Sequence, residues 1–569
     1  MTQLTITIAT ISWLASVAAP VSAQWTLTQG GTTGIAAMQM TVATPTNVVI
    51  VDKFEQNPLH DQNGHPALGA IYSVVSDTVR ALNIVTNSFC ATGTWLSNGT
   101  LINAGGNPVV ALPDSSSPNG LQAVRLFNPC ADNGNCNFYE SPSRIRLTSS
   151  RWYPSSVRLS DGSALIFGGA YGGGWTNFEQ LNNPSYEYYP PKNINEYNGL
   201  QIPSQFLKDS LPHNMFPHMM LLPSNSIFVA ANKMTMLLNW QTNTETRLPN
   251  LPNGQTVTYP MSGCGVLLPL SYENNYKPEV MLCGGSELSD TLKENEVSSQ
   301  SPTSKQCSRM VLNSAGIAAG WATEQMPYGR VMPDATILPD GKILILNGAK
   351  TGTAGYGNVP DQIGQSNADN PAFTPLLYNP SAPAGSRFSS AGMPTSTIAR
   401  LYHSVSMLLP DGRIMIAGSN PNADVETRKY KTEYQVEYIS PSYIFQTRPT
   451  YSGLPATWNY GQQISLAVQS SFSLIPTVVC TLHDLGYATH GVHMDMRMVK
   501  LPCTLSMFRT TITVTGPPNA AIYPPGPAWL FVIVDGIPSK AQKVLIGTGA
   551  SPPVDQGAIT NMLQSTGGP

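Results

Sequence analysis

The stretch Asp161-Gly-Ser-Ala-Leu-Ile-Phe-Gly-Gly169 decides the fold, because related segments recur along the whole chain. Seven such segments start at Asn47, Asn98, Asp161, Ser224, Pro278, Asp340 and Asp411. The clearest of them combine an Asp-Gly or Asn-Gly turn with a β-branched strand and paired glycines, a pattern typical of β-hairpins. Successive starts are 51 to 71 residues apart, which leaves room for one four-stranded antiparallel sheet in each period. The repeat predicts an all-β, seven-bladed, kelch-like β-propeller over residues 24–447.

The rest of the chain follows a different pattern. Residues 448–546 contain short apolar strands between Pro and Gly turns, which predicts an immunoglobulin-like β-sandwich. Residues 547–569 carry few apolar side chains, and we expect a loose C-terminal tail. A stack of sandwich domains is the alternative architecture, but it gives no reason for one turn signature to recur at these spacings.

The composition excludes several classes of protein. The 569 residues include 30 Lys+Arg and 33 Asp+Glu, a net charge of -3, so no nucleic-acid partner is expected. Charged residues make up 11%, against about 25% in ordinary domains. Hydrophobic residues make up 41%, yet only short apolar runs follow residue 25, which argues against both a disordered chain and a membrane protein. We expect a monomer.

The first residues predict export from the cell. Residues 1–23 are uncharged and largely apolar and end in Val21-Ser22-Ala23, the small-x-small pattern of a signal-peptide cleavage site. Cleavage after Ala23 would leave Gln24 first. The sequon Asn98-Gly99-Thr100 suits a secreted glycoprotein. The protein is therefore expected to be extracellular.

Eight cysteines in an oxidising compartment suggest disulfides. Local spacing favours the pairs Cys130–Cys136 and Cys480–Cys503, with Cys283–Cys307 as a third pair. Cys90 and Cys264 remain. An unpaired cysteine in a secreted protein needs burial or another chemical fate, and for Cys264 the sequence leaves this open.

A candidate site emerges from the register of the repeat. Propellers bind ligands at their axis, where the innermost strand of each blade begins. Cys90, Tyr153 and His403 each lie eight residues before the turn of their repeat, and Tyr402 lies nine before it. At the same offset two other repeats place Phe216 and Met332, and the repeat at Pro278 is preceded by Ser262; these residues coordinate metals weakly or not at all. One such Tyr or Cys would usually only pack, but the coincidence of four reactive side chains indicates a shared site.

A fifth candidate comes from the sandwich region. His490 and Gly491 lie midway between Cys480 and Cys503, as in a hairpin stapled by a disulfide with a histidine at its tip. Two imidazoles, two phenolates and one open position suit Cu(II). Zinc would more often recruit thiolates or carboxylates.

These motifs closely resemble those of the copper radical oxidases, glyoxal oxidase and galactose oxidase, over roughly residues 24–547. The motifs are Phe89-Cys90, Arg151-Trp152-Tyr153, Tyr402-His403-Ser404, Thr489-His490 and Asp495-x-Arg497. The segment NNPSYEYYPP at 182–191 looks more like glyoxal oxidase.

The resemblance implies one copper ion and a protein-derived radical cofactor, a thioether between Cys90 and Tyr153. Tyr153, His403 and His490 would be equatorial copper ligands, and Tyr402 the axial ligand that accepts the substrate proton. The implied reaction oxidises small aldehydes, such as glyoxal or methylglyoxal, to carboxylic acids while O2 becomes hydrogen peroxide, which peroxidases could consume. The alternatives are an alcohol or galactose-type oxidase of the same family, or a non-catalytic propeller that binds polysaccharide.

Two features depart from the family pattern or stay open. His493 stands where the family commonly has Asn, and we expect it to orient the site or to line the substrate mouth. Trp152 and Trp175 are the candidates for the aromatic ring that stacks on the thioether.

Overall fold

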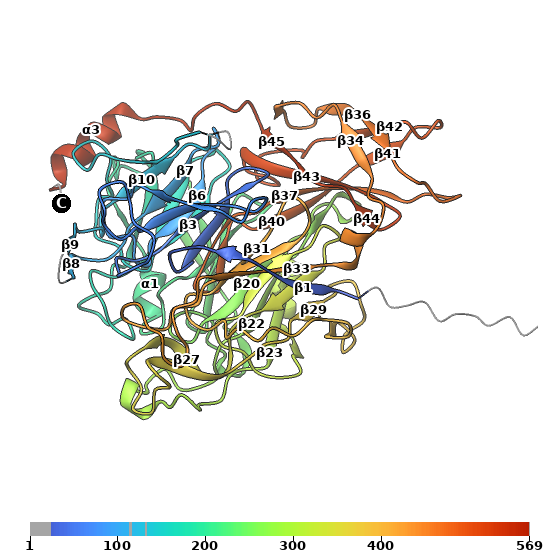
Figure 1. Cartoon of the computed structure of the whole chain (residues 1–569). Helices are drawn as coiled ribbons and strands as arrows, with labels where there is room; N and C mark the ends of the chain where they lie inside the picture. The colour runs from blue at the N-terminus through green and yellow to red at the C-terminus, as the bar shows by residue number, and fades with distance from the viewer. Residues whose placement is uncertain (1–23, 113–115, 131–133, 568–569) are drawn as a thin grey trace, which may run out of the picture.

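The structure, a computed structural model, describes residues 24–112, 116–130 and 134–567, so the expected signal peptide lies outside the described residues. Strands dominate this part of the chain (Figure 1). Its α-helices are short: α1 (Gln205–Asp209), α2 (Ser314–Ala319) and α3 (Gln556–Ser565). None of the helices in the described part is long and apolar enough to cross a bilayer.

Seven antiparallel sheets follow one another along the described chain, and each contains one of the recurring segments. The first three consist of β2–β5 (Gln39–Val42, Asn47–Val51, Gly69–Ser73, Val79–Leu82), β6, β7, β10 and β11 (Thr92–Trp95, Leu101–Ala104, Val124–Phe127, Phe138–Glu140), and β12–β15 (Ser155–Arg158, Ala164–Phe167, Ser185–Tyr189, Ile202–Pro203). The fourth and fifth consist of β16–β19 (His218–Leu221, Ile227–Ala231, Met234–Asn239, Thr244–Leu248) and β20, β22, β23 and β24 (Gly263–Leu267, Glu279–Gly284, Gln306–Val311, Ala322–Gln325). The last two consist of β25, β26, β29 and β30 (Asp334–Ile337, Ile343–Leu346, Leu376–Tyr378, Phe388–Ser389) and β31, β32, β33 and β1 (Val405–Leu408, Ile414–Ala417, Gln435–Ser440, Thr26–Thr32).

The Asp-Gly turns form for a local reason. Asp161 accepts a hydrogen bond from the Ser163 backbone N–H at 3.1 Å, and Asp411 accepts one from that of Arg413 at 2.9 Å. The glycine between them takes a positive φ, +83° at Gly162, where a side chain would be strained. Each turn therefore reverses the chain between the first and second strands of its sheet.

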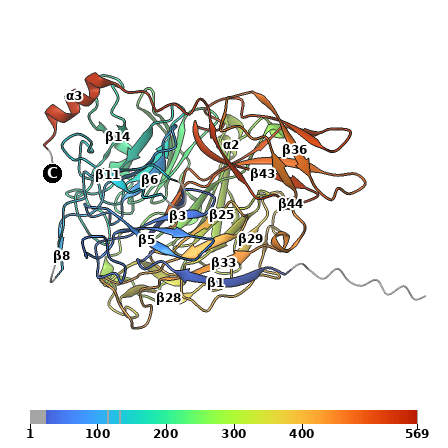
Figure 2. The ribbon, with the colours of Figure 1, turned by 45° about the horizontal axis from the view of Figure 1, so that its top comes forward.

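Strand β1 joins the two ends of the repeat region. It pairs antiparallel with β33, with Thr26 opposite Ser440 and Thr32 opposite Gln435, and is the outer strand of the seventh sheet. Figures 1 and 2 both show β1 alongside β33. The beginning of the repeat region is therefore tied to its end.

The C-terminal domain is built from two further sheets, which lie to one side of the seven (Figure 2). One contains β35 (Thr457–Trp458), β37 (Val478–Asp484), β40 (Arg497–Leu501), β43 (Gly526–Val534), β44 (Ile537–Pro538) and β45 (Gln542–Ile546), and also β21 (Leu270–Ser271) from the fifth repeat. The other contains β34 (Thr450–Ser452), β36 (Gln463–Gln469), β41 (Cys503–Leu505) and β42 (Thr511–Thr515). Side chains from both share one core that includes Trp458, Leu466 and Leu482, as the predicted sandwich requires.

A hairpin leaves this domain and enters the space between the seven sheets. Its strands are β38 (Tyr487–Thr489) and β39 (Val492–Met494). Strand β38 contacts β2, β6 and β31, while β39 contacts β12, β16, β20 and β25. The hairpin thus touches the first strand of every one of the seven sheets, which places its tip at their centre.

The predicted disulfides form in part. Cys130–Cys136 and Cys283–Cys307 are bonded. The prediction of a Cys480–Cys503 disulfide is wrong for this structure: both cysteines are free, and the Cys503 thiol on β41 donates to the carbonyl oxygen of Val478 on β37 at 3.7 Å. The hairpin is held instead by pairing between β38 and β2. Cys264 is a buried free thiol on β20.

The C-terminal segment differs from the expected loose tail. Asp555 caps helix α3 by accepting from the Ala558 N–H, and Ala558 and Met562, four residues apart on one face, are buried. The Arg146 guanidinium donates to the carbonyl oxygens of Leu563 at 2.9 Å and Thr566 at 2.7 Å. The buried apolar pair and Arg146 dock this helix, together with Asn561, whose side chain donates to the Asn198 carbonyl at 2.8 Å.

Candidate metal centre

A ring of residues precedes the first strands of the sheets, each two positions before its strand. These residues have φ between 51° and 63°, in the left-handed region: Cys90, Tyr153, Phe216, Met332 and His403. Backbone bonds connect neighbours in the ring, since Tyr153 N donates to Cys90 O at 3.1 Å and Phe216 N donates to Tyr153 O at 3.0 Å. The register chosen from the sequence therefore corresponds to a distinct backbone conformation.

His490 reaches this ring from the C-terminal domain. Thr489 pairs with Val492, so His490 and Gly491 form a two-residue turn in which φ is +53° and +80°. Two positive φ values are what a tight hairpin turn of type I′ requires. The sequence-based prediction that His490 lies at the tip of a hairpin is confirmed.

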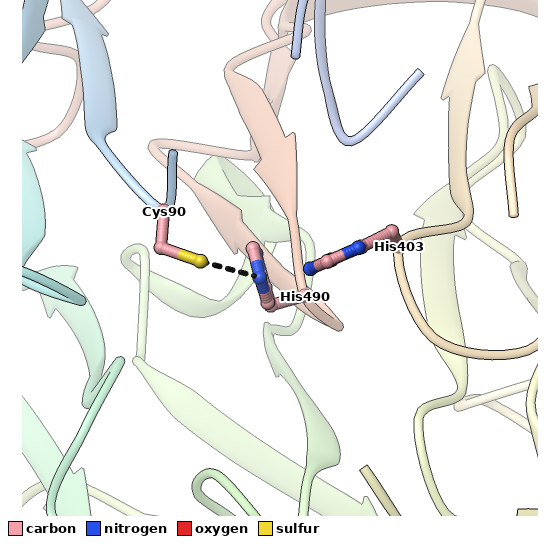
Figure 3. Close-up of side chains that lie close together, drawn as sticks. All are labelled: Cys90, His403 and His490. Atoms are coloured by element: carbon pink, nitrogen blue, oxygen red, sulfur yellow. Dashed lines mark hydrogen bonds between the residues drawn. The ribbon is translucent and has the colours of Figure 1, made fainter. Parts of the chain in front are cut away.

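The five predicted site residues come together at the centre. Ligand atoms of Cys90, His403 and His490 all lie within 4.8 Å of one another, and all three residues are buried (Figure 3). The Cys90 Sγ lies 3.3 Å from His490 Nε2. The hydroxyls of Tyr153 and Tyr402 share a hydrogen bond, and each ring centroid is 5.2 Å from that of His490. Residues as far apart in sequence as Cys90 and His490 thus share one small volume.

Hydrogen bonds fix the tautomers of both histidines. His403 Nδ1 lies 2.9 Å from the carbonyl oxygen of Asn420, which can only accept, so Nδ1 carries the proton. His490 Nδ1 lies 2.5 Å from the hydroxyl oxygen of Thr489, whose own proton goes to the carbonyl of Met38. Each Nε2 therefore keeps its lone pair. That of His403 is buried with no hydrogen-bond partner among the described residues.

The buried side chains carry no charge of their own. Burial raises the pKa of Cys90, Tyr153 and Tyr402 well above their ordinary values. It lowers the pKa of His490 to about 3 and that of His403 well below 6.5. A divalent cation bound by two phenolates would leave the site neutral, which offsets the cost of burying the metal. Two imidazole nitrogens and two phenol oxygens fit Cu(II).

The Cys90 thiol lies beside the Tyr153 side chain. It lies in the same buried cluster as Tyr153 and belongs to no disulfide. Because both residues sit at the same position of adjacent repeats, their side chains meet from neighbouring strands, β6 and β12. This contact is the geometric precondition for a covalent link between sulfur and ring.

The aromatic surroundings of Tyr153 differ in part from expectation. The ring of Trp152 lies 4.2 Å away but nearly perpendicular, at 82°, whereas Trp175 packs in a separate cluster with Met261. Tyr259, which sequence reasoning missed, lies 4.6 Å away at an interplanar angle of 41°. Tyr259 precedes its strand by four residues and so falls outside the repeat register. The only signal for it was an aromatic residue near the candidate position in the fifth repeat.

His493 does not belong to the cluster. Its ring nitrogens face two backbone carbonyl oxygens, that of Leu485 at 2.6 Å and that of Ala335 at 3.3 Å. Of the two neighbouring histidines, the structure brings only His490 among the ligand atoms. The contacts of His493 anchor the hairpin to β25 and to its own base.

The fold and the cluster together define a two-domain β protein whose second domain adds a buried histidine, His490, to a group of potential metal ligands in the first. The family description "Glyoxal oxidase N-terminus" matches residues 41–443, and "Galactose oxidase-like, Early set domain" matches residues 448–546. The chain therefore belongs to the glyoxal oxidase family, which confirms the resemblance seen in its motifs.

Individual relatives cover most of the chain. "Aldehyde oxidase GLOX" of Vitis pseudoreticulata is 31% identical over 539 residues, covering 90% of this chain and 95% of that protein. A galactose oxidase of Gibberella zeae is 24% identical, covering 80% of this chain and 60% of that protein. Among solved structures, a fungal alcohol oxidase of the AA5 family in complex with copper matches with a TM-score of 0.68 at 16% identity, over 92% of this chain and 99% of that one. At this low sequence identity, the match to the alcohol oxidase structure supports the fold of this chain alone.

Proposed function

We propose that the protein is a secreted copper radical oxidase that oxidises small aldehydes, as their hydrates, to carboxylic acids and reduces O2 to hydrogen peroxide. The observation that carries the proposal is the convergence of two unprotonated imidazole nitrogens, two phenols and a thiol in one buried site. Membership of the glyoxal oxidase family and the aldehyde oxidase of Vitis pseudoreticulata support the substrate class.

The proposal includes the architecture that assembles the site. The seven sheets are the blades of a closed, kelch-like propeller, and the β38–β39 hairpin lies on its axis. Contacts between the first strands of successive sheets support this, as does the closure of the seventh sheet by β1. The substrate then approaches the ring of left-handed residues at one end of the axis.

The chain's own residues have distinct roles in this reaction. Tyr153, Tyr402, His403 and His490 would hold copper, which supplies one-electron redox chemistry. Tyr402, as a phenolate in the metal-bound protein, would accept the proton of the substrate hydroxyl. Its oxygen shares a hydrogen bond with the Tyr153 oxygen, so the two acceptors face the same point. Tyr153, linked to Cys90 and present as its one-electron-oxidised radical, would accept the hydrogen atom from the substrate carbon. The second electron would pass to the bound copper, and O2 would take up both electrons and both protons as it becomes hydrogen peroxide. The buried aromatic rings around both tyrosines exclude bulk water.

The cross-link gives the most direct test. A Cys90–Tyr153 thioether is two hydrogens lighter than the separate residues and resists reduction, so peptide mapping of the copper-loaded, fully reduced protein should recover both segments as one species. Cys90→Ser should retain copper and the fold but lose most turnover. Free alkylation of Cys90 in the copper-loaded protein would exclude the proposed cofactor.

An alcohol oxidase is the second candidate, favoured by the similarity to galactose oxidase. Peroxide release with methylglyoxal, glycerol and galactose separates the two activities, and we expect methylglyoxal to be the best of the three. A preference for galactose or glycerol would reassign the substrate class. Copper content of one per chain together with peroxide release would exclude a non-catalytic, polysaccharide-binding propeller.

The proposal extends to the cellular setting. Secretion with cleavage after Ala23 predicts Gln24 as the first residue of the mature protein, which N-terminal sequencing would identify. We propose that the secreted protein is a monomer and that its hydrogen peroxide supports peroxidases outside the cell. Recovery of the protein only from the cell interior, with residues 1–23 intact, would contradict this localisation.

A further inference from the structure

A buried ion pair lies behind the copper ligand His403. The Lys53 ammonium is 3.3 Å from the Glu55 carboxylate, and the two side chains are 3% and 0% exposed. Lys53 Nζ also donates to the backbone carbonyls of Asn422 at 2.6 Å and Ala423 at 2.8 Å. Both charged groups are thus enclosed by protein, and neither belongs to the ligand cluster.

Asn420 connects this ion pair to the metal site. Its side-chain N–H2 donates to both oxygens of Glu55, at 3.0 and 2.7 Å. Its backbone carbonyl accepts the Nδ1 proton of His403 at 2.9 Å, and its backbone N–H donates to the Tyr402 carbonyl at 3.0 Å. A carboxylate can only accept hydrogen bonds, so Glu55 fixes which way the Asn420 amide points. The backbone carbonyl that orients His403 also belongs to Asn420, so Glu55 holds that carbonyl in place through the Asn420 side chain.

Lys53 also acts on the immediate surroundings of His403. Its ammonium lies 5.6 Å from the ring centroid of Phe89 and 5.2 Å from that of Tyr356. Those rings lie 5.7 and 6.3 Å from the imidazole of His403. Burial alone would lower the pKa of Lys53, but attraction to Glu55 and to the tyrosine raises it above its ordinary value. The ammonium therefore remains charged and holds both rings against the ligand.

We propose that Glu55 and Lys53 are positioning residues that fix the orientation and tautomer of His403 through Asn420 and so tune copper binding; this rests on the proposed copper site. Groups that receive the second ring N–H of a metal-bound histidine commonly change metal affinity 10–100-fold when they are lost. A buried ion pair is by itself weak evidence for a gain in protein stability. The position of the Lys53–Glu55 pair behind His403 is therefore best explained by a role in holding that ligand.

The test uses copper itself as the probe. The purified protein, stripped of metal, is titrated with Cu(II) against a competing chelator, and the Cu(II) EPR spectrum and the thermal unfolding of the metal-free form are recorded. Glu55→Gln keeps the shape of the side chain but removes its charge. The double variant Lys53→Met/Glu55→Gln removes both charges of the pair together, so neither is left buried without the other, and it separates loss of positioning from misfolding. For both variants we expect copper affinity to fall about 10- to 100-fold, with altered copper hyperfine splitting.

The control is Glu279→Gln, which removes the partner of Arg309 at 2.8 Å in the fifth sheet, away from the ligands. It should lower the unfolding temperature without changing copper affinity or the EPR spectrum. Wild-type affinity and spectrum in the folded double variant would overturn the positioning role and leave the proposed function intact. Failure of the wild-type protein to bind copper would overturn both.

Discussion

At the scale of single residues, the site is assembled from strained backbone. Tyr153, His403 and His490 hold φ values of 60°, 63° and 53°, a conformation that costs a non-glycine residue roughly 1–2 kcal/mol. The surroundings enforce it. A Cβ on Gly418 would lie 2.2 Å from the His403 carbonyl oxygen, and the buried Arg400 guanidinium donates to the Gly418 carbonyl. Glycine at 418 therefore lets the backbone close in behind the ligand.

The two neighbouring histidines should differ when replaced. His490→Ala removes an Nε2 lone pair aimed at the centre, so we expect activity to be abolished and copper affinity to fall by at least about 100-fold, the upper end of the loss seen when a group that only supports a ligand is removed. His493→Ala removes contacts to the carbonyls of Leu485 and Ala335 and should cost about 1–3 kcal/mol of stability while copper is retained. Metal analysis and denaturant unfolding check both. Full activity in His490→Ala would show that the wrong histidine was chosen.

At the scale of elements, the hairpin β38–β39 depends on its turn. A Cβ on Gly491 would lie 2.9 Å from the carbonyl oxygen of Pro333, and φ is already +80°. Gly491→Ala should therefore destabilise the protein by more than about 1 kcal/mol and weaken copper binding by shifting His490. The matched control is Gly254→Ala, where φ is +74° but no atom lies within 4 Å. If backbone strain alone decided the outcome, Gly491→Ala and Gly254→Ala would lower the free energy of unfolding equally. Unchanged copper affinity in Gly491→Ala would contradict the role of the turn in positioning His490.

The elements show what could and could not be predicted from the sequence. The Asp-Gly turns fixed the register of the inner strands, because such turns act locally, and that register led to Cys90, Tyr153 and His403. The tip position of His490 was inferred from its place midway between Cys480 and Cys503, and it is correct although those cysteines form no disulfide. The pairing of β1 with β33 was not predictable, since a strand's partner some 400 residues away leaves no local signal. For the same reason the link from Glu55 through Asn420 to His403 appeared only when the chain was folded.

At the scale of the whole molecule, β1 holds the repeat region together. Removing residues 24–32 would leave the outer edge of β33 unpaired, at a cost on the order of 3 kcal/mol for a few backbone hydrogen bonds. We expect a lower melting temperature and a tendency to aggregate through the exposed edge. Removal of residues 556–569, which include α3, is the comparison, because that helix docks on the surface and pairs with no strand. An equal melting temperature in the β1 deletion and the full chain would refute the closing role.

The molecule as a whole should lose stability in acid because it buries neutral histidines. Burial lowers the pKa of His213 and His218 to about 4 and that of His483 and His490 to about 3. In the unfolded chain these groups titrate near 6.5, so below that pH the unfolded state binds protons that the folded state does not. Each histidine then costs about 1.4 kcal/mol of stability per pH unit, as the pH falls from 6.5 toward the folded pKa.

His483 isolates this effect, because it lies in the C-terminal domain, where it packs against Phe531, outside the ligand cluster. His483→Gln cannot take up a proton in either state, so its free energy of unfolding should depend less steeply on pH between 6 and 4, by about 1.4 kcal/mol per unit. Measuring both proteins at saturating copper cancels the contribution of His490. Equal slopes in wild type and His483→Gln would mean that His483 is already protonated in the folded state, or that the unfolded chain does not titrate it freely.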